Sequence, residues 1–274
     1  MKKNIVIVML LVSFGAISQS KASKKELKKN RPTYIDIAIG KEYSRFVDFA
    51  TSPLIYSGAQ NYISISYNKY DKKKEKEYGF SYSFGDYISD FNEHESISTV
   101  KTLSLYYSQL YQLNKFSTKK LNIKIGGLFD ATGNFRINES LENNGVGLEI
   151  IPTLFGSIKA SKYFISRHGK DKELSFRLNI GLINSTFRNG YVYSGQSFLL
   201  NKPILESVFD DYQFKVFSGF RMSSALSYTM PLKNKNKIQF SYLWGAYKTG
   251  GNFDTFEMAN HSIKFTLSFN LNNH

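Results

Sequence analysis

The sequence predicts an all-β fold, a transmembrane antiparallel up-and-down β-barrel of about ten strands, within a range of about 8 to 12. Three observations support this prediction. Apolar side chains alternate with polar or small ones in many segments, and the connections between these segments alternate in length. Aromatic residues make up 16% of the chain, although its mean hydropathy is only −0.32. A helical membrane protein would be far more apolar, whereas half of each barrel strand faces a polar lumen.

The alternation is clearest between Ile263 and Leu271, where five apolar residues are separated by single polar ones. This is the pattern of a half-buried strand, because successive side chains of a strand point to opposite faces. Several such segments reach the roughly 9–11 residues that a tilted membrane strand requires. Pro152 is expected to break the phase of its segment. The expected strands are 33–40, 61–70, 77–89, 98–112, 119–130, 147–165, 173–186, 212–230, 237–248 and 260–272.

The connections between these segments fall into two classes. The short ones are 71–77, 113–120, 167–173 and 232–237. The mostly longer ones are 41–60, 86–96, 131–146, 187–211 and 249–260. Every short connection has a net positive charge, and none of the long ones does. Short turns at one end and long loops at the other are typical of membrane barrels, with the long loops outside. An even number of strands then leaves both termini in the periplasm.

The N-terminal region predicts export. Lys2 and Lys3 precede an uncharged run from Ile5 to Ile17, so residues 1–22 are interpreted as a signal peptide cleaved after residue 18, 20 or 22. Residues 23–32 are expected to form a basic arm, and residues 33–274 the barrel domain. The sequence contains no cysteine, which excludes disulfides, thiolate metal sites and a lipid-modified N-terminal cysteine. The net charge is +14, but an exported chain rarely meets nucleic acid, and no recognition motif is present.

The last predicted strand carries most of a barrel-assembly signal. Lys264, Thr266, Phe269 and Leu271 match its spacing, with Thr266 in place of the usual glycine, and the chain continues to His274 instead of ending on an aromatic residue. Through this segment and its architecture, the chain resembles small outer-membrane β-barrel proteins of Gram-negative bacteria over residues 33–272. The resemblance implies a place in the bacterial outer membrane. It also implies contact with outer-membrane lipid and lipopolysaccharide, and insertion by the barrel-assembly machinery.

If the large apolar side chains face lipid, the opposite phase of each strand lines the lumen. Two readings of the charges in that phase are open: they pair and hold a filled interior together, or they line a constricted, anion-preferring passage. The predicted lumen charges are Asp36, Lys124, Glu149, Arg177, Lys215, Arg221 and Lys264. Tyrosines near strand ends would suit the two interfacial girdles. They are Tyr78, Tyr87, Tyr107, Tyr111, Tyr212, Tyr228 and Tyr247.

Catalytic and metal-binding signals are weak. His94 and Ser96 have a His-x-Ser spacing that is similar to outer-membrane phospholipase A and a lipid A deacylase, but they fall in a predicted loop, where a solvated histidine is the simpler interpretation. The omptin proteases also have a ten-strand barrel, but no Asp-x-His pair occurs here. One predicted loop has an acidic cluster that could hold Ca²⁺ or bridge to lipopolysaccharide, yet it lacks calcium-loop spacing. Its members are Asp86, Asp90, Glu93 and Glu95. No cofactor motif is found.

These observations predict a non-enzymatic outer-membrane barrel that acts as a narrow pore or as a structural or surface-interaction protein. The alternatives are a membrane-embedded lipid hydrolase using His94 and Ser96, and a secreted β-sandwich adhesin. Closure of a barrel also makes a geometric prediction, because an open strand edge in lipid would leave backbone groups unpaired. Asp36 on the first strand and Lys264 on the last are therefore expected on adjacent strands, both facing the lumen.

Overall fold

The computed structural model describes residues 31–91, 94–141, 145–165, 171–189, 212–232, 234–249 and 255–272. The predicted signal peptide and most of the basic arm lie outside these residues and stay predictions. One short 3-10 helix is present, η1 (Asn114–Phe116), and no helix in the described part of the chain is long and apolar enough to cross a membrane. The strands are β1 (Thr33–Asp48), β2 (Ser52–Tyr70), β3 (Lys74–Phe91), β4 (His94–Gln112), β5 (Leu121–Ile137), β6 (Val146–Ile165), β7 (Asp171–Asn189), β8 (Tyr212–Val216), β9 (Phe220–Pro231), β10 (Lys237–Lys248) and β11 (Phe256–Asn270).

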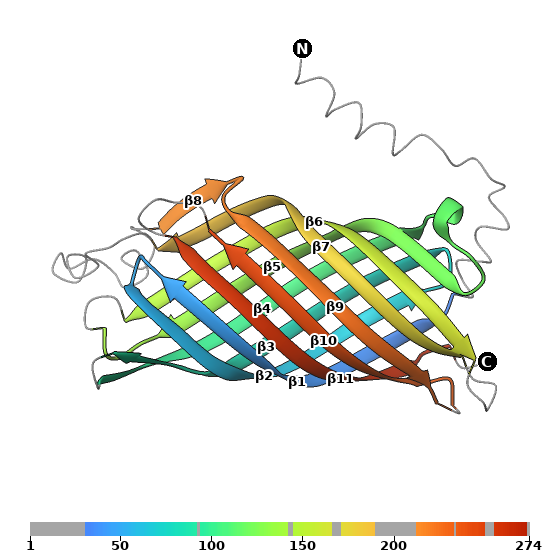
Figure 1. The fold of residues 1–274 in the computed structure, drawn as a ribbon, viewed down its shortest axis with the longest axis horizontal. Helices are drawn as coiled ribbons and strands as arrows, with labels where there is room; N and C mark the ends of the chain where they lie inside the picture. The colour runs from blue at the N-terminus through green and yellow to red at the C-terminus, as the bar shows by residue number, and fades with distance from the viewer. Residues whose placement is uncertain are drawn as a thin grey trace, which may run out of the picture. The chain divides into compact units, whose positions relative to one another are not determined.

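The described strands close into an antiparallel barrel (Figure 1). Each strand from β1 to β7 pairs with the next, β7 pairs with β9, and β9 to β11 continue the sequence until β11 pairs with β1. The short β8 pairs with one end of β7, so β8 and β9 together occupy one position of the ring. The barrel therefore has ten positions, and the predicted fold class and seam between the first and last strands are confirmed.

The register shows that the strands are tilted. From Ile39, the pairing followed through β2 to β6 reaches Phe187 on β7, whereas the pairing followed through β11, β10 and β9 reaches Leu174 on the same strand. Such a stagger closes a barrel only when its strands lean from the axis, typically by about 35–45°. We call the end with the short connections proximal, and the end with the turn Phe49–Thr51 distal.

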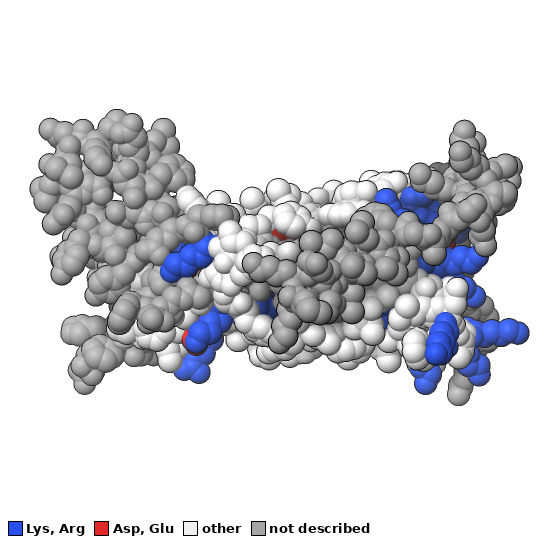
Figure 2. Space-filling view, turned by 90° about the horizontal axis from the view of Figure 1, so that it is seen from above, with Lys and Arg blue, Asp and Glu red and all other residues white. Residues whose placement is uncertain are grey.

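An apolar band surrounds the outer face of the barrel. On β3, Lys76 and Asp86 border four outward aromatic side chains: Tyr78, Phe80, Tyr82 and Phe84. Ten residues that rise about 3.3 Å each at a tilt of about 40° span about 25 Å, the height of the apolar band of membrane barrels. Lys101 on β4 is exposed and ends the band distally on its strand, whereas β1 has two exposed cations on this face, first Lys41 and then, farther toward the distal end, Arg45. Figure 2 shows the matching distribution, with most described charges toward the two ends of the visible face.

Three of the predicted long loops are too long, because the strands extend through most of two of them and half of the third. The segment 41–60 is almost entirely β1 and β2, which meet at the tight turn Phe49–Thr51. The segment 86–96 is likewise mostly strand, and half of 131–146 is strand, because β5 continues to Ile137 and β6 begins at Val146; residues 92–93 and 142–144 lie outside the description. Polar, proline-containing sequence suggested loops there, but the backbone N–H and C=O groups of the strand residues still pair with neighbouring strands. Most of the predicted loop 187–211 lies outside the described residues.

Two smaller predictions are also corrected. The expected strand 212–230 divides at Phe217 to Gly219, where both end residues have positive φ, 54° and 78°. This backbone conformation interrupts a strand, and it suits glycine. In contrast, Pro152 causes no phase change, because burial alternates through it. The register shift on β6 lies instead between Leu154 and Phe155, in the pairing with β7.

The girdle prediction is wrong for two tyrosines. Tyr87 is completely buried in a cluster inside the barrel, and Tyr247 packs against the same cluster. Tyr78 and Tyr111 are exposed on the outer face, as a girdle requires. The side chain of Tyr212 lies outside the description.

Candidate functional site in the lumen

The lumen of the barrel is the candidate functional site, and its contents differ along the axis. Charged residues form ion pairs near the proximal end. A cavity of about 410 Å³ begins among these residues and continues along the barrel. Beyond it, a packed group of aromatic and charged side chains lies across the lumen at the distal end. Each layer is described in turn below.

The proximal ion pairs join side chains from four strands. Glu75 on β3 accepts hydrogen bonds from the ammonium groups of Lys124 (3.1 Å) on β5 and Lys159 (2.9 Å) on β6. Glu77 is two residues after Glu75 on β3 and pairs with the Arg177 guanidinium at 3.2 Å. The same guanidinium donates to the Ser108 hydroxyl at 2.7 Å. These contacts connect β3 to β5, β6 and β7 across the interior. They brace the barrel wall where the cavity begins.

The cavity wall is rich in hydroxyl and amide groups. Ser, Thr and Asn side chains from most strands line it, together with Tyr62, Tyr106 and Tyr247. Arg221 reaches into it from β9, donates to the Thr132 hydroxyl at 2.6 Å and pairs with Asp130 at 3.4 Å. Polar groups at this density hold water or a polar solute, because a buried polar atom without a partner is costly.

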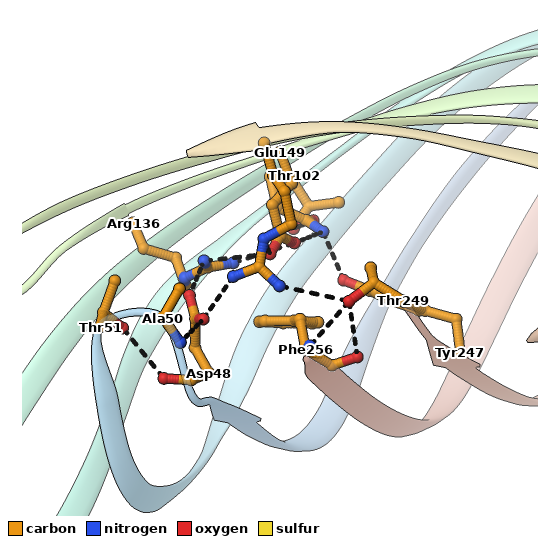
Figure 3. Close-up of polar contacts among 11 residues, drawn as sticks. Asp48, Ala50, Thr51, Thr102, Arg136, Glu149, Tyr247, Thr249 and Phe256 are labelled. Carbon is orange, nitrogen blue, oxygen red and sulfur yellow. Dashed lines mark hydrogen bonds and ion pairs between the residues drawn. The ribbon is translucent and has the colours of Figure 1, made fainter. Parts of the chain in front are cut away.

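A buried four-charge network lies at the distal end (Figure 3). The Arg136 guanidinium pairs with Asp48 at 2.5 Å and with Glu149 at 3.1 Å. Arg188 pairs with the other Asp48 oxygen and lies 3.6 Å from Glu149. All four side chains have exposures of 5% or less. The two cations and two anions therefore compensate each other's loss of water, and they join β1, β5, β6 and β7.

An aromatic cluster packs directly against this network. Its members are Phe46, Tyr56, Tyr87, Val100, Phe256 and Met258. The Phe46 ring stacks on Tyr56 and Phe256 at centroid distances of 5.1 and 5.5 Å, and the Arg136 guanidinium lies 4.5 Å from the Phe256 ring centroid. The cation–π contact ties the ionic and aromatic groups together. We call these six residues, with the four charged ones, the distal plug.

The turn between β1 and β2 holds one member of the distal plug in place. Asp48 ends β1, and its carboxylate accepts a hydrogen bond from the Ala50 amide at 3.1 Å while its carbonyl accepts one from the Thr51 amide, also at 3.1 Å. Aspartate commonly closes turns in this way. The same carboxylate faces both plug arginines, so the turn is fastened to the opposite wall of the barrel.

The structure brings most of the predicted lumen charges to one cavity. Asp36, Lys124, Arg177, Arg221 and Lys264 all line it. Glu149 belongs instead to the distal plug, and Lys215 is opposite Thr186 in the register of β7 and β8. Several of these charges are paired. Whether the lumen prefers anions stays a prediction.

The seam prediction is confirmed in its main point. Asp36 on β1 and Lys264 on β11 lie on adjacent strands, and both line the cavity. They do not meet, because Asp36 is opposite Ser268, whereas Lys264 is opposite Gly40. Asp36 accepts a hydrogen bond from the Asn68 amide at 2.8 Å, and the Lys264 ammonium lies 3.4 Å from the Tyr62 ring centroid.

The weak catalytic candidates are on a strand, not in the predicted loop. His94 and Ser96 belong to β4, but the side chain of His94 lies outside the description. The Ser96 hydroxyl is buried and is 2.6 Å from the Ser140 hydroxyl, 3.1 Å from that of Tyr56 and 3.1 Å from the Asn138 amide nitrogen. These contacts give Ser96 a structural place at the edge of the distal plug.

The metal-site candidates are not gathered into a site by the described residues. Asp86 is exposed on the outer face of β3, where it accepts a hydrogen bond from Thr99 at 2.7 Å. The side chains of Asp90 and Glu95, and all of Glu93, lie outside the description. No group of three or more metal-binding side chains occurs in the part of the chain that the structure describes.

Sequence reasoning missed most of the distal plug. Asp48, Arg136 and Arg188 fell in predicted long loops, so they were not considered for the lumen. A usable signal was nevertheless present. From Thr132 onward, polar residues recur at every second position through Asn134 and Arg136 to Asn138, which continues the inward phase of β5 beyond the predicted strand.

No protein-family model matches this sequence, and no curated protein matches it either. Similar solved structures include the outer membrane protease OmpT from Escherichia coli, at a TM-score of 0.48 and 10% identity, covering 94% of this chain and 99% of that chain. The chain resembles outer-membrane β-barrel proteins. The NalP autotransporter translocator domain from Neisseria meningitidis is also similar, at a TM-score of 0.42 and 7% identity, with coverage of 90% and 92%. These likenesses concern barrel architecture alone, and no activity is transferred from either protein.

Proposed function

We propose that this chain is an exported, non-enzymatic barrel of the bacterial outer membrane with a lumen closed at its outer end. It would act as a structural or surface-interaction barrel and not as an open pore. The observation that carries this proposal is the distal plug, in which ion pairs and stacked rings extend across the lumen. The apolar band of about 25 Å supports the membrane location.

The orientation follows from the same features. The short, basic connections would lie in the periplasm, and the distal turn Phe49–Thr51 would lie outside the cell. Asp86 and Lys101 end the band on their strands, and Arg45 is the more distal of the two exposed cations on β1. Each of these three residues is next to a plug residue in the sequence: Tyr87, Val100 and Phe46. The plug would therefore lie where the barrel leaves the bilayer.

Membrane location can be tested by fractionation and by gel mobility. The full chain, expressed in a Gram-negative host, should be found in the outer membrane and should migrate differently before and after boiling. Recovery as a soluble protein with unchanged mobility would contradict the membrane assignment and favour a secreted sandwich.

Closure of the lumen can be tested in planar lipid bilayers. The purified wild-type barrel should give no stable conductance steps, because the plug leaves no continuous water path. The variant Tyr56→Ala/Phe256→Ala removes two plug rings and should conduct, whereas the matched variant Phe240→Ala, on the outer apolar band, should stay silent. Stable steps from the wild type would show an open pore and overturn this proposal.

A further inference from the structure

The middle of the cavity contains two opposite charges that lack an ionic partner among the described residues. Glu42 on β1 and Lys264 on β11 both line the cavity, and neither forms an ion pair with any residue that the structure describes. Arg221 and Asp130, which line the same cavity, do pair, at 3.4 Å. Burying a charge without an ionic partner is costly unless other polar groups compensate it. The two groups are compensated in different ways.

Neutral donors hold the Glu42 carboxylate in a fixed position. One oxygen accepts a hydrogen bond from the Asn260 amide and the other from the Ser262 hydroxyl, both at 2.9 Å. The Ser44 hydroxyl is a third, longer donor at 3.4 Å. Donors of this kind stabilise the anion without cancelling its charge. A carboxylate has about four acceptor sites, so one remains for a ligand.

The Lys264 ammonium is positioned by a glycine. Gly40 on β1 lies between Lys264 on β11 and Tyr62 on β2 in the register, and it faces the lumen without a side chain. A Cβ added at Gly40 would be 3.1 Å from the Lys264 Cγ and 2.3 Å from the Ile263 carbonyl oxygen. The lysine can therefore lie across β1 and place its ammonium 3.4 Å from the centre of the Tyr62 ring. Its three N–H groups donate to no described residue.

These two groups are spaced for a short ligand with opposite charges at its ends. Glu42 is two residues from Gly40 on the same face of β1, about 7 Å along the strand. The Lys264 ammonium lies toward Tyr62 on β2, whereas the Glu42 carboxylate lies toward Ser262 on β11, so the two groups are also one to two strand spacings of about 4.8 Å apart across the sheet. Together these offsets place the two groups on the order of 10 Å apart. An extended dipeptide is about 7 Å long, and a hydrogen bond of about 2.9 Å at each end lets it reach both groups. The cavity of about 410 Å³ accommodates a molecule of this size, and its hydroxyl and amide lining matches peptide groups.

We propose that the lumen binds a small zwitterion of dipeptide size, with its anionic group at Lys264 and its cationic group at Glu42. The ligand would enter from the proximal end, because the cavity wall includes Lys159 and Glu173 there, whereas the charged residues of the distal plug do not line it. This inference concerns binding and not passage. It therefore does not depend on whether the distal plug closes the lumen.

The test uses the detergent-solubilised, full-length barrel and three probes. Glycylglycine carries both charges, N-acetylglycylglycine carries only the carboxylate, and glycylglycinamide carries only the ammonium group. Calorimetric or NMR titration should show glycylglycine binding at least tenfold more tightly than either of the others. Equal binding of the acetylated probe would mean a simple anion site, and no binding of any probe would mean that water alone occupies the cavity. Either result would overturn the proposal.

Variants locate the site within the barrel. Lys264→Met and Glu42→Gln should each weaken glycylglycine binding at least tenfold, whereas Lys41→Met and Glu257→Gln, which change charges on the outer face of the same two strands, should not. Unchanged affinity in both cavity variants would place the probe elsewhere and contradict the assignment. Unboiled gel mobility shows whether each variant has folded. If a cavity variant does not fold, the three-probe comparison on the wild type still decides the question.

Discussion

The part of the barrel inside the apolar band and its distal part are packed differently, although the same strands run through both. Within the band, Phe80 faces outward and Ser81 inward, as expected where lipid lies outside and water inside. Beyond Arg45, Asp86 and Lys101, aromatic side chains such as Phe46 and Tyr87 turn to the interior and pack there. Alternation continues in phase across this boundary, but large apolar residues now lie on both faces, as with Ile88 outward and Tyr87 inward. The distal part is therefore packed partly as a water-soluble β-protein, with a core of its own.

The comparison predicts its largest effect at Arg136. Removing one member of a buried ionic group leaves the others uncompensated, at a cost of about 3–5 kcal/mol. Arg136→Met should lower the free energy of unfolding in urea by about this amount. The control Lys248→Met breaks an exposed pair with Glu257 and should cost less than about 1 kcal/mol. Similar losses in the two variants would mean that the distal network is not a buried core.

The second effect locates the bilayer on β3. A lysine at the middle of the apolar band costs about 2–4 kcal/mol, but only about 0–1 kcal/mol near an interface. Phe80→Lys should therefore reduce the free energy of unfolding in lipid vesicles far more than Ile88→Lys, although both positions are exposed on the same face of the strand. A larger loss at Ile88 would move the band toward the distal end and contradict the proposed boundary at Asp86.

A smaller effect is expected at the proximal ion pairs. Glu75→Gln keeps the shape of the side chain but leaves the Lys124 and Lys159 ammonium groups without their shared carboxylate. Glu75 accepts two hydrogen bonds from ammonium groups, and the carbonyl oxygen of glutamine can still accept one of them. Lys124 also donates to the Asp71 carbonyl at 2.8 Å. The loss should therefore be that of one hydrogen bond to a charged group, about 1.5–3 kcal/mol, and below that of Arg136→Met. Urea unfolding of the two variants under the same conditions compares the free energy of unfolding that each end of the lumen loses. A greater loss at Glu75 would reverse the comparison.

The sequence was sufficient for the barrel but not for the plug, and the reason is physical. Strands such as 260–272 have apolar residues on one face only, so their period of two is visible in the sequence. In the distal part, Ile55 and Ile88 face outward while Phe46 and Tyr56 face inward, so hydrophobicity no longer distinguishes the faces. There the strands are fixed by pairing with neighbours and by the network around Arg136. Which arginine meets which carboxylate depends on register, which sequence periodicity does not contain.

The central claim, a lumen open to the proximal side and closed at the distal side, can be tested with introduced cysteines. The chain contains no cysteine, so Thr51→Cys at the distal turn and Ser64→Cys on the cavity wall are each a unique thiol. Each variant is reconstituted into sealed vesicles, and a small charged methanethiosulfonate is added outside only. Labelling of Thr51→Cys measures the fraction of barrels with the distal end outward. If the plug closes the lumen, the reagent reaches Ser64→Cys only in barrels whose proximal end faces outward. The labelled fractions of the two variants should then add up to the whole population. Labelling of Ser64→Cys in nearly every molecule, whatever the orientation, would show a continuous passage and contradict the claim.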